Sequence, residues 1–427
     1  MVRVGCEVDT MRGSVAGPKF SLLSVFLPIN MALGASQPLI PLFVVKIGGS
    51  IADVGLVASA YSLSAIFASR FWGSVSDRAG KRRPFIILGF TSTSIILFSF
   101  FFVSVVWQLI LLNAIMGFLT TAYIPSASML IIENNPRREW ASRISLYNFF
   151  TGLGFSLGMM VGAFWLSFES LRTLFLALAT ISVVGVVMST YMIKEPLVTI
   201  ERHAISVITS EIVDHIRYFP TLMVNLPELF NISNWSKMIR SRLLRDLPYF
   251  YLSSAILFTA FSMFFTPLPT YYRSIGASNS NVFLLLLIHG FTLTFASILV
   301  RRLSRKSEKL LLRSGLLIRI VAFLAFAVAS ATGFFVGRDW SIAVIMVLTG
   351  ISWPFYWVPS LTFLSKIADQ NRLGEAQGTL NSMIGLGNVL GSLFSGYLVT
   401  IMNYQLNFVS SVIMMIIGFG LIADVLS

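Results

Sequence analysis

Five charged side chains separate two long apolar runs in the stretch GSVSDRAGKRRP, residues 73–84. Its Gly80-Lys81 pair also occurs at the end of a phosphate-binding loop, where it would cradle the phosphates of ATP. That loop further requires Gly at position 75 and Ser or Thr at position 82, where this chain has Val75 and Arg82. No ATP site is therefore predicted here, and the spacing of glycine, acid and base needs another explanation.

Titratable side chains are rare inside the apolar runs. Asp53, Glu133 and Asp424 all lie at the margin of a run, whereas His289 lies deep within one. An imidazole changes its charge near neutral pH, so His289 could exchange a proton. A hydrogen bond from a neighbouring helix could equally satisfy it, and the sequence leaves both interpretations open.

Two arginines, Arg70 and Arg319, also lie within apolar runs. We interpret both as side chains that snorkel toward the membrane surface or bind a backbone carbonyl. The alternative for Arg319 is that it orients an anionic substrate.

Several classes of function are excluded. No nucleophile, base and orienting residue occur together, so no enzyme is predicted. Cys6 is the single cysteine, and His203, His215 and His289 show no metal-ligand spacing, so neither a metal nor another cofactor is predicted. The net charge of +13 comes from short basic clusters between apolar runs rather than from a solvated basic face, so no nucleic-acid partner is predicted.

The composition indicates an integral membrane protein, because 56% of the 427 residues are hydrophobic and 11% are charged, against about a quarter charged in soluble domains. A helix needs about 20 apolar residues to cross a bilayer. Twelve such runs lie at about 20–45, 54–76, 84–106, 107–132, 142–166, 171–193, 248–272, 281–300, 310–335, 340–364, 374–400 and 404–425. The predicted fold class is an all-α membrane protein with twelve transmembrane helices.

The placement of basic residues predicts the orientation. Most of the 31 Lys and Arg fall on one side of the alternating spans, and the loops on the other side hold only Lys46, Arg172, Arg273 and Arg338. The positive-inside rule then places both termini in the cytoplasm. The first run is too long for a signal-peptide core and is read as an uncleaved span.

The longest polar segment divides the spans six and six, so we expect halves at 1–193 and 248–427 with a cytoplasmic linker at 194–247. Patterns such as AISVITSEIVDHI predict amphipathic helices in this linker, lying on the inner membrane face, with a regulatory partner site as the alternative.

The two halves repeat each other. NFFTGLGFSLG at residues 148–158 and NSMIGLGNVLG at residues 381–391 are both N-x3-G-x-G-x3-G, and FAS at 67–69 recurs at 295–297. Ordered repeats predict two pseudo-symmetric six-helix bundles with a binding site at the midplane between them. Small residues at helical spacing favour close helix packing, which we assign to Gly152, Gly154, Gly158, Gly385, Gly387 and Gly391.

The opening stretch resembles the loop between helices two and three of the major facilitator superfamily, whose pattern is G-x-x-x-D-R/K-x-G-R/K-R/K. The residues that fit are Gly73, Asp77, Arg78, Gly80, Lys81 and Arg82. The resemblance implies a gating role for these six residues, with Gly73 in close helix contact. It also implies that Asp77 faces the start of the eleventh helix, near Gly374 and Glu375, when the inner side is shut.

The basic side chains of the loop, including Arg83, would then lie at the anionic inner membrane surface. The alternative is that the charges only set topology. The matching loop of the second half has Arg305 in place of the acid and lacks the glycines, so an asymmetric gate is expected.

The same resemblance implies which helices surround a central cavity, and polar or aromatic residues in those helices become pathway candidates. They are Asn30, Gln37, Asn113, Tyr123, His289, Trp353, Tyr356, Trp357 and Asn388. Packing is the alternative for the aromatic residues of this set. Arg319 falls in the ninth helix, which the resemblance places at the periphery.

The function expected from the resemblance is secondary active transport by alternating access, as an exporter of small amphipathic compounds through the plasma membrane. Uptake of a neutral solute such as a sugar is the alternative, and a receptor or signalling protein that retains the fold is the alternative from another class. The expected partners are a small-molecule substrate, the lipid bilayer and a coupling proton or cation, and the expected state is a monomer. Exporting members of the family tend to carry G-x-x-x-G-P-x-x-G-G in the fifth helix, and residues 154–163 follow this pattern with Met159 for Pro and Ala163 for the last Gly.

Overall fold

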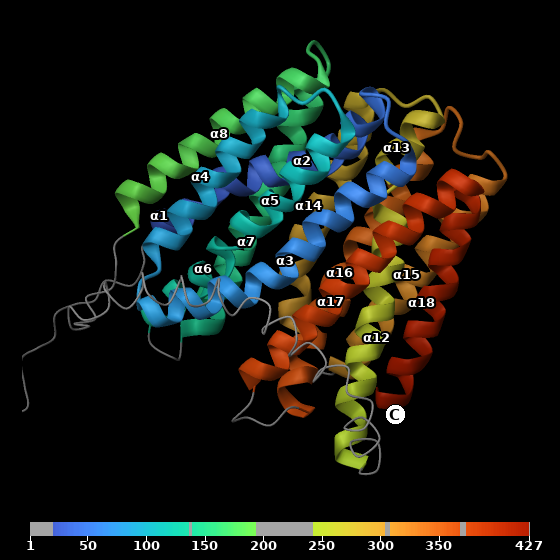
Figure 1. Ribbon diagram of the computed structural model, residues 1–427. Coiled ribbons are helices and arrows are strands. Elements are labelled where there is room, and N and C mark those ends of the chain that lie inside the picture. Colours follow the sequence, from blue (N-terminus) through green and yellow to red (C-terminus); the bar gives the residue numbers. More distant parts are fainter. Residues whose placement is uncertain (1–19, 136–138, 194–241, 304–307, 368–372, 427) are drawn as a thin grey trace, which may run out of the picture.

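The computed structural model describes residues 20–135, 139–193, 242–303, 308–367 and 373–426, and the regular structure in these ranges is entirely helical (Figure 1). Twelve helical segments are long and apolar enough to cross a membrane, which confirms the predicted fold class. The first half contains α1 (Phe20–Leu23), α2 (Phe26–Lys46), α3 (Ile51–Ala79), α4 (Arg83–Phe100), α5 (Val106–Thr120), α6 (Tyr123–Glu133), α7 (Trp140–Trp165) and α8 (Leu171–Met192). The second half contains α12 (Arg242–Phe265), α13 (Leu268–Ser274), α14 (Asn279–Leu303), α15 (Glu308–Ala331), α16 (Asp339–Ile367), α17 (Leu373–Ile401) and α18 (Tyr404–Leu426).

Proline interrupts two of the spans and separates α5 from α6 and α12 from α13. Pro125 has no N–H to donate to the Thr121 carbonyl, which instead accepts from the backbone N–H of Ile124 at 3.3 Å. Pro267 likewise leaves the Met263 carbonyl without its helical donor. The buried Asn407 of α18 fills that place, because its Nδ2 donates to this carbonyl at 2.8 Å.

The structure describes only the end of the expected linker. α12 begins at Arg242, inside the segment 194–247 that we expected to connect the halves. The amphipathic helices predicted in the linker fall at 194–241, outside the described residues, and so does Arg305.

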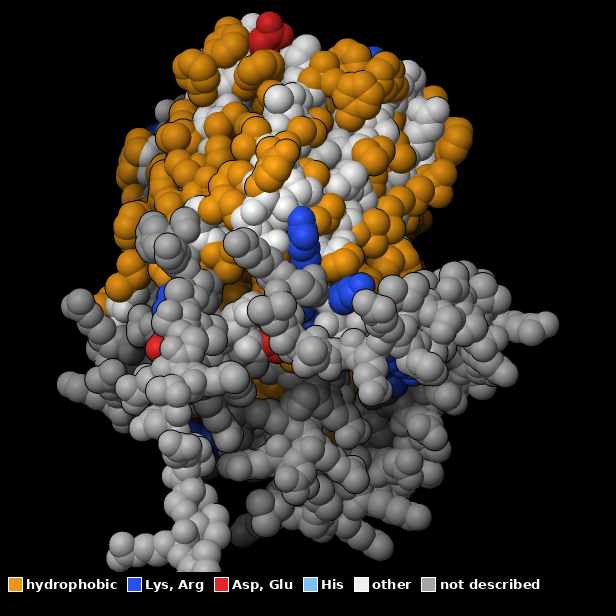
Figure 2. All heavy atoms as spheres, turned by 90° about the vertical axis from the view of Figure 1, so that its left-hand side faces the viewer, with side chains coloured by type: hydrophobic (Ala, Val, Ile, Leu, Met, Phe, Trp, Pro, Cys, Tyr) orange, Lys and Arg blue, Asp and Glu red, His pale blue; other side chains and the backbone are white. Residues whose placement is uncertain are grey.

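The outer surface of the helices is apolar. Figure 2 shows one face of the molecule, where hydrophobic side chains dominate the described part and Lys and Arg gather toward its lower portion. Large apolar side chains on α4 and α8 are exposed, among them Ile95, Phe98, Val183, Val184 and Val187. Exposed apolar surface on this scale fits contact with lipid tails rather than with water.

The two halves meet mainly through two helix pairs, α3 with α17 and α7 with α14 (Figure 1), and α2 also touches α13 and α14. The sequence repeat relates α3 to α14 and α7 to α17, because 67–69 recurs at 295–297 and 148–158 recurs at 381–391. The two contacts between the halves are therefore equivalent under the pseudo-symmetry.

Candidate functional site

The contact between α3 and α17 is tight at the end of the molecule opposite the 73–84 loop. The backbone N–H of Ala52 donates to Thr400 Oγ1 at 2.8 Å, and the Ser59 and Ser392 hydroxyls lie 2.6 Å apart. A Cβ placed on Gly55 would collide with the Ser392 carbonyl oxygen, so only a glycine permits this backbone approach. We call this end of the molecule the closed end.

The symmetry-equivalent pair, α7 and α14, is also in close contact at the closed end. Ser280 Oγ donates to the Ala163 carbonyl at 2.7 Å. Farther along, a Cβ on Gly290 would lie 2.9 Å from Ser156 Oγ, and one on Gly152 would lie 2.9 Å from Thr294 Oγ1. The halves thus remain in contact as far as the middle of both helices.

Toward the 73–84 loop the halves separate. Near the middle of both helices, Ile66 of α3 lies against Gly385 of α17. Beyond it, Ser69 and Asn381 are exposed, and no atom lies within 4 Å of the position of a Cβ on Gly378. The ribbons of α3 and α17 diverge in this direction (Figure 1). The molecule is therefore closed at one end and open between its halves at the other.

The 73–84 loop lies at the open end. Gly80 has φ 58°, a backbone conformation that favours glycine and makes the tight reversal between α3 and α4. Among the described residues, Gly73 does not make the close helix contact expected of it, since none of their atoms lies within 4 Å of the position of its Cβ. The expected approach of Asp77 to Gly374 and Glu375 falls outside the described residues.

The expectation that all basic residues of the loop lie at the membrane surface is wrong for Arg82, although Arg78 and Lys81 are exposed. The Arg82 side chain is 6% exposed, and its Nη2 lies 2.7 Å from Oε1 of Glu133, at the end of α6. It also donates from Nη1 to Ser76 Oγ at 3.0 Å. Glu133 lies 51 residues further along the chain, and its carboxylate offsets part of the cost of burying the guanidinium.

Arg83 also turns toward protein, since its Nη2 donates to the Thr190 carbonyl of α8 at 2.6 Å.

In the first half, the side-chain amides of two predicted pathway residues donate hydrogen bonds to backbone carbonyls of the protein. Asn30 Nδ2 donates to the Phe26 carbonyl at 2.7 Å, and Asn113 Nδ2 donates to the Val57 carbonyl at 2.8 Å, which ties α5 to α3. Both side chains are buried, whereas Gln37 is exposed. Tyr123 is buried and packs against Phe90 rather than projecting between the halves.

In the second half, aromatic side chains of α12 and α16 form one cluster. Trp353 and Trp357 stack with ring centroids 5.8 Å apart and planes at 12°, and Phe258 and Phe261 each lie 5.7 Å from Trp353. We call these four residues the aromatic wall. Both tryptophans are half-buried, whereas Tyr356, which also contacts Trp353, is fully buried.

Arg319 is buried against this wall. Of the two arrangements expected for it, it binds a backbone carbonyl and does not snorkel toward a membrane surface. Its side chain is 1% exposed; Nε donates to Ser352 Oγ at 2.9 Å and Nη2 to the Thr349 carbonyl at 2.8 Å. Its guanidinium carbon lies 4.5 Å from the ring centroid of Phe261 and 5.0 Å from that of Trp353. The central position of Arg319 in α15 was the available signal, because a side chain there cannot reach either membrane surface.

His289 lies beside this cluster on α14. Its Nδ1 is 3.0 Å from Thr349 Oγ1, and its ring lies 5.2 Å from that of Phe265. The side chain is therefore satisfied by a neighbouring helix, as one of the two sequence interpretations has it. The half-buried Asn388 lies on α17. Its backbone carbonyl accepts a hydrogen bond from Ser262 Oγ at 3.0 Å.

The six glycines assigned to packing fall into two groups. Four face the backbone or side chains of a helix in their own half: Gly154, Gly158, Gly387 and Gly391. Gly152 and Gly385 face the other half, at Thr294 and Ile66. Equivalent positions of the repeat thus serve the same surfaces in both halves.

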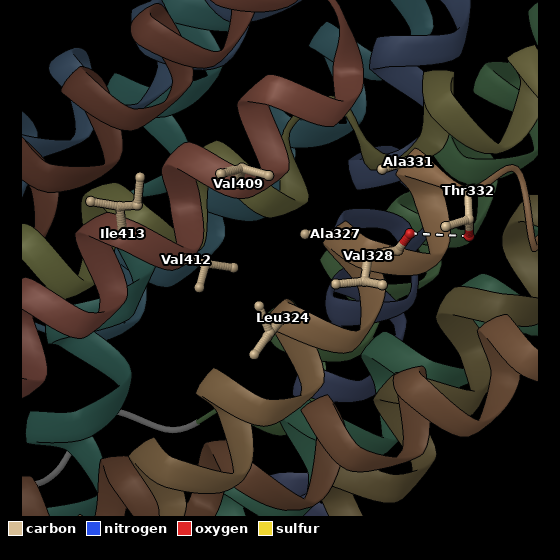
Figure 3. Close-up of a pocket in the computed structure, with 8 residues that line it drawn as sticks. All are labelled: Leu324, Ala327, Val328, Ala331, Thr332, Val409, Val412 and Ile413. Carbon is tan, nitrogen blue, oxygen red and sulfur yellow. Dashed lines mark hydrogen bonds between the residues drawn. The ribbon is translucent and has the colours of Figure 1, made fainter.

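A groove of about 370 Å³ lies between α15 and α18, away from the aromatic wall (Figure 3). It is lined by Leu324, Ala327, Val328, Ala331, Thr332, Val409, Val412 and Ile413. Its one polar side chain, Thr332, donates to the Val328 carbonyl of its own helix at 3.1 Å. With no free polar group, this groove is suited to hydrocarbon alone.

Within the described ranges, no group of three His, Cys, Asp or Glu side chains could hold a metal ion.

Comparison with known proteins agrees with this geometry. The profile of the Major Facilitator Superfamily matches residues 22–337 and 318–424. The multidrug resistance protein MdtG of Klebsiella pneumoniae is 28% identical over 44% of this chain and 43% of its own length. The multi-drug resistance efflux pump PmrA of Streptococcus pneumoniae is 26% identical over 46% of this chain and 50% of its own. The matches thus span about half the length of these relatives or less.

Among solved structures, a mutant of the nucleoside transporter NupG superposes with a TM-score of 0.73 at 16% identity, over 95% of this chain and 98% of that one. This likeness concerns the fold. With a family profile that covers nearly the whole chain and twelve helices arranged in two related halves, this protein belongs to the Major Facilitator Superfamily of membrane transporters.

Proposed function

We propose that the protein is a secondary active transporter that works by alternating access and exports small amphipathic compounds. The observation that carries this proposal is the pair of equivalent contacts between the halves, which end at mid-helix. Rocking the halves about such contacts would close the open end and open the closed end, while a midplane site stays in place.

The aromatic wall supports an amphipathic substrate. Trp353 and Trp357 are half-buried and lie near the middle of α16, and aromatic faces bind hydrophobic ligands with little loss of side-chain freedom. The relatives MdtG and PmrA are named as a multidrug resistance protein and a multi-drug resistance efflux pump, which agrees with export.

Uptake of a neutral sugar has weaker support. Binding a sugar would need free amides, but the Nδ2 groups of Asn30 and Asn113 donate to backbone carbonyls in this conformation, and Asn113 keeps only its buried Oδ1 without a partner.

The proposed orientation places the 73–84 loop and both termini in the cytoplasm, so that this conformation faces inward. We propose the plasma membrane as the location, since the relatives are bacterial, and a monomer as the working unit. His289 remains our candidate for a coupling proton, and a cation is the alternative.

Flux into or out of liposomes that contain only this protein tests the proposal. We expect a lipophilic dye to be moved against its gradient when a pH gradient is imposed, and the flux to stop when the gradient is collapsed. Accumulation of a sugar instead would favour uptake. Ligand binding without any flux would favour a receptor.

The gating role proposed for the 73–84 loop predicts that Asp77→Asn slows transport several-fold and leaves membrane insertion and melting temperature unchanged. Neutralising this carboxylate would remove its attraction to the helix N-terminus that it is proposed to face in the outward-open state. Initial rates in liposomes measure the effect, with Glu169→Gln, at the opposite end, as the matched charge control. A normal rate in Asp77→Asn would refute the gating role.

A further inference from the structure

Arg319 is a buried cation without an anionic partner among the described residues. The salt bridges that the structure describes are Arg82 with Glu133, Arg143 with Glu139 and Lys366 with Glu308, and all lie at helix ends. Arg319 sits at the middle of α15 and is 1% exposed.

The sequence gives no carboxylate that could approach Arg319 at this depth. Every acidic residue of the chain lies at the margin of an apolar run or outside the runs. A guanidinium stays protonated in proteins, so the interior of the second half carries a positive charge that no carboxylate neutralises.

Neutral groups hold this charge in place. Two of the three guanidinium nitrogens donate to Ser352 and Thr349 of α16, and the π-faces of Phe261 and Trp353 lie within 5.0 Å. The third nitrogen, Nη1, is buried without a hydrogen-bond partner. These contacts stabilise the cation without cancelling its field outside the cluster.

The field acts on the aromatic wall. Arg319 lies against Trp353, and Trp353 stacks on Trp357; both rings are half-buried. A compound that contacts the exposed part of these rings would have the guanidinium behind them, across one layer of low-dielectric side chain. At a distance of about 10 Å and an effective dielectric of about 20, a unit charge changes the affinity for a charged ligand by roughly tenfold.

We propose that Arg319 sets the charge preference of the transport site, so that it takes neutral and anionic aromatic compounds and disfavours lipophilic cations. This inference rests on the proposed function, in which the aromatic wall contacts substrate. Arg319 acts here as a specificity-determining residue through the wall. A purely structural role, in which it only ties α15 to α16, would leave ligand charge preference unchanged when it is replaced.

Three probes with one aromatic scaffold test the inference: 2-naphthoate, 2-naphthylmethanol and 2-naphthylmethyl-trimethylammonium. Dissociation constants are measured by equilibrium dialysis with the purified full-length protein in nanodiscs of uncharged lipid. We expect the wild type to bind the carboxylate and the alcohol at least about tenfold more tightly than the ammonium compound. Arg319→Gln, which removes the charge and keeps hydrogen-bonding groups, should lower the anion-to-cation preference about tenfold and leave the affinity for the alcohol unchanged.

Two controls separate charge from structure. Arg319→Lys keeps the charge without the planar fork and should keep the preference. Arg313→Gln removes a charge from the same helix at the Ala423 carbonyl, away from the aromatic wall, and should also keep it. If Arg319→Gln does not fold, the wild-type affinities for the three probes still test the inference, because equal binding or a preference for the ammonium compound would overturn it.

The outcomes are distinct. A wild type that binds the three probes equally, or prefers the ammonium compound, would overturn the inference and leave the proposed function standing, as would an unchanged preference in Arg319→Gln. Charge-selective binding without flux in liposomes would overturn the proposed function and support the preference. Failure of all three probes to bind would overturn both.

Discussion

At the scale of single residues, the buried polar side chains of this protein are held by specific partners. Arg82 contacts Glu133 through Nε and Nη2, and the pair connects the 73–84 loop to the end of α6. Arg319 is held by hydroxyl, carbonyl and ring groups instead of a carboxylate. The first arrangement makes a stable anchor at a helix end, whereas the second keeps a net charge in the interior.

The Arg82 pair predicts that Glu133→Gln lowers the free energy of unfolding by about 2 kcal/mol, because a buried guanidinium loses its charged acceptor. The measurement is the melting temperature in detergent. Glu139→Gln is the matched control, since Glu139 pairs with Arg143 at a site where both side chains are partly exposed, and exposed pairs contribute little. Equal shifts in the two variants would contradict this account.

At the scale of elements, proline and a distant amide together shape the seventh span. Pro267 ends α12 and frees the Met263 carbonyl, and Asn407 of α18 donates to it. The break in α12 is therefore stabilised by a helix at the far end of the sequence. A hydrogen bond of the same kind, from the Asn113 amide to the Val57 carbonyl, connects α5 to α3.

This pairing predicts a double-mutant result. Asn407→Ala should cost about 1–3 kcal/mol of unfolding free energy, because it leaves the Met263 carbonyl unsatisfied in a buried place. Pro267→Ala restores a backbone N–H at the position that a continuous helix would use, so the double variant should recover most of the loss. Stability curves of the single and double variants measure the coupling, and simple additivity would refute it.

At the scale of the whole molecule, the two halves touch along one end and part at the other. The closed end depends on small residues, since Gly55, Ser59 and Ser392 bring the backbones of α3 and α17 together. Few side chains would need to separate for this end to open, and no ion pair bridges it among the described residues. Such a contact suits a surface that must form and break in every transport cycle.

A disulfide across the closed end should stop the cycle. In a chain without its native cysteine (Cys6→Ser), Ser59→Cys combined with Ser392→Cys replaces two hydroxyls that lie 2.6 Å apart. Oxidation should abolish most of the flux in liposomes, and a reductant should restore it, because the closed end can then open again. Each single cysteine variant serves as the control for modification alone. Undiminished flux in the oxidised double variant would contradict alternating access about this contact.

Much of this architecture was open to prediction from the sequence alone. The twelve spans and the repeat of the halves follow from hydropathy, run length and ordered motifs, which are local properties of the chain. The 73–84 motif likewise pointed to the family, and Gly80 does adopt the positive φ that its reversal needs.

Only the tertiary structure decided which polar groups form hydrogen bonds or ion pairs within the protein. The burial of Arg82 against Glu133, the engagement of Asn30 and Asn113 by carbonyls, and the position of Arg319 behind Trp353 depend on the rotation of each helix and on the neighbour it faces. Several faces of an apolar helix are nearly equal in hydropathy, so the sequence does not specify that rotation. Packing against the other helices selects it, and with it the charge that lies behind the aromatic wall.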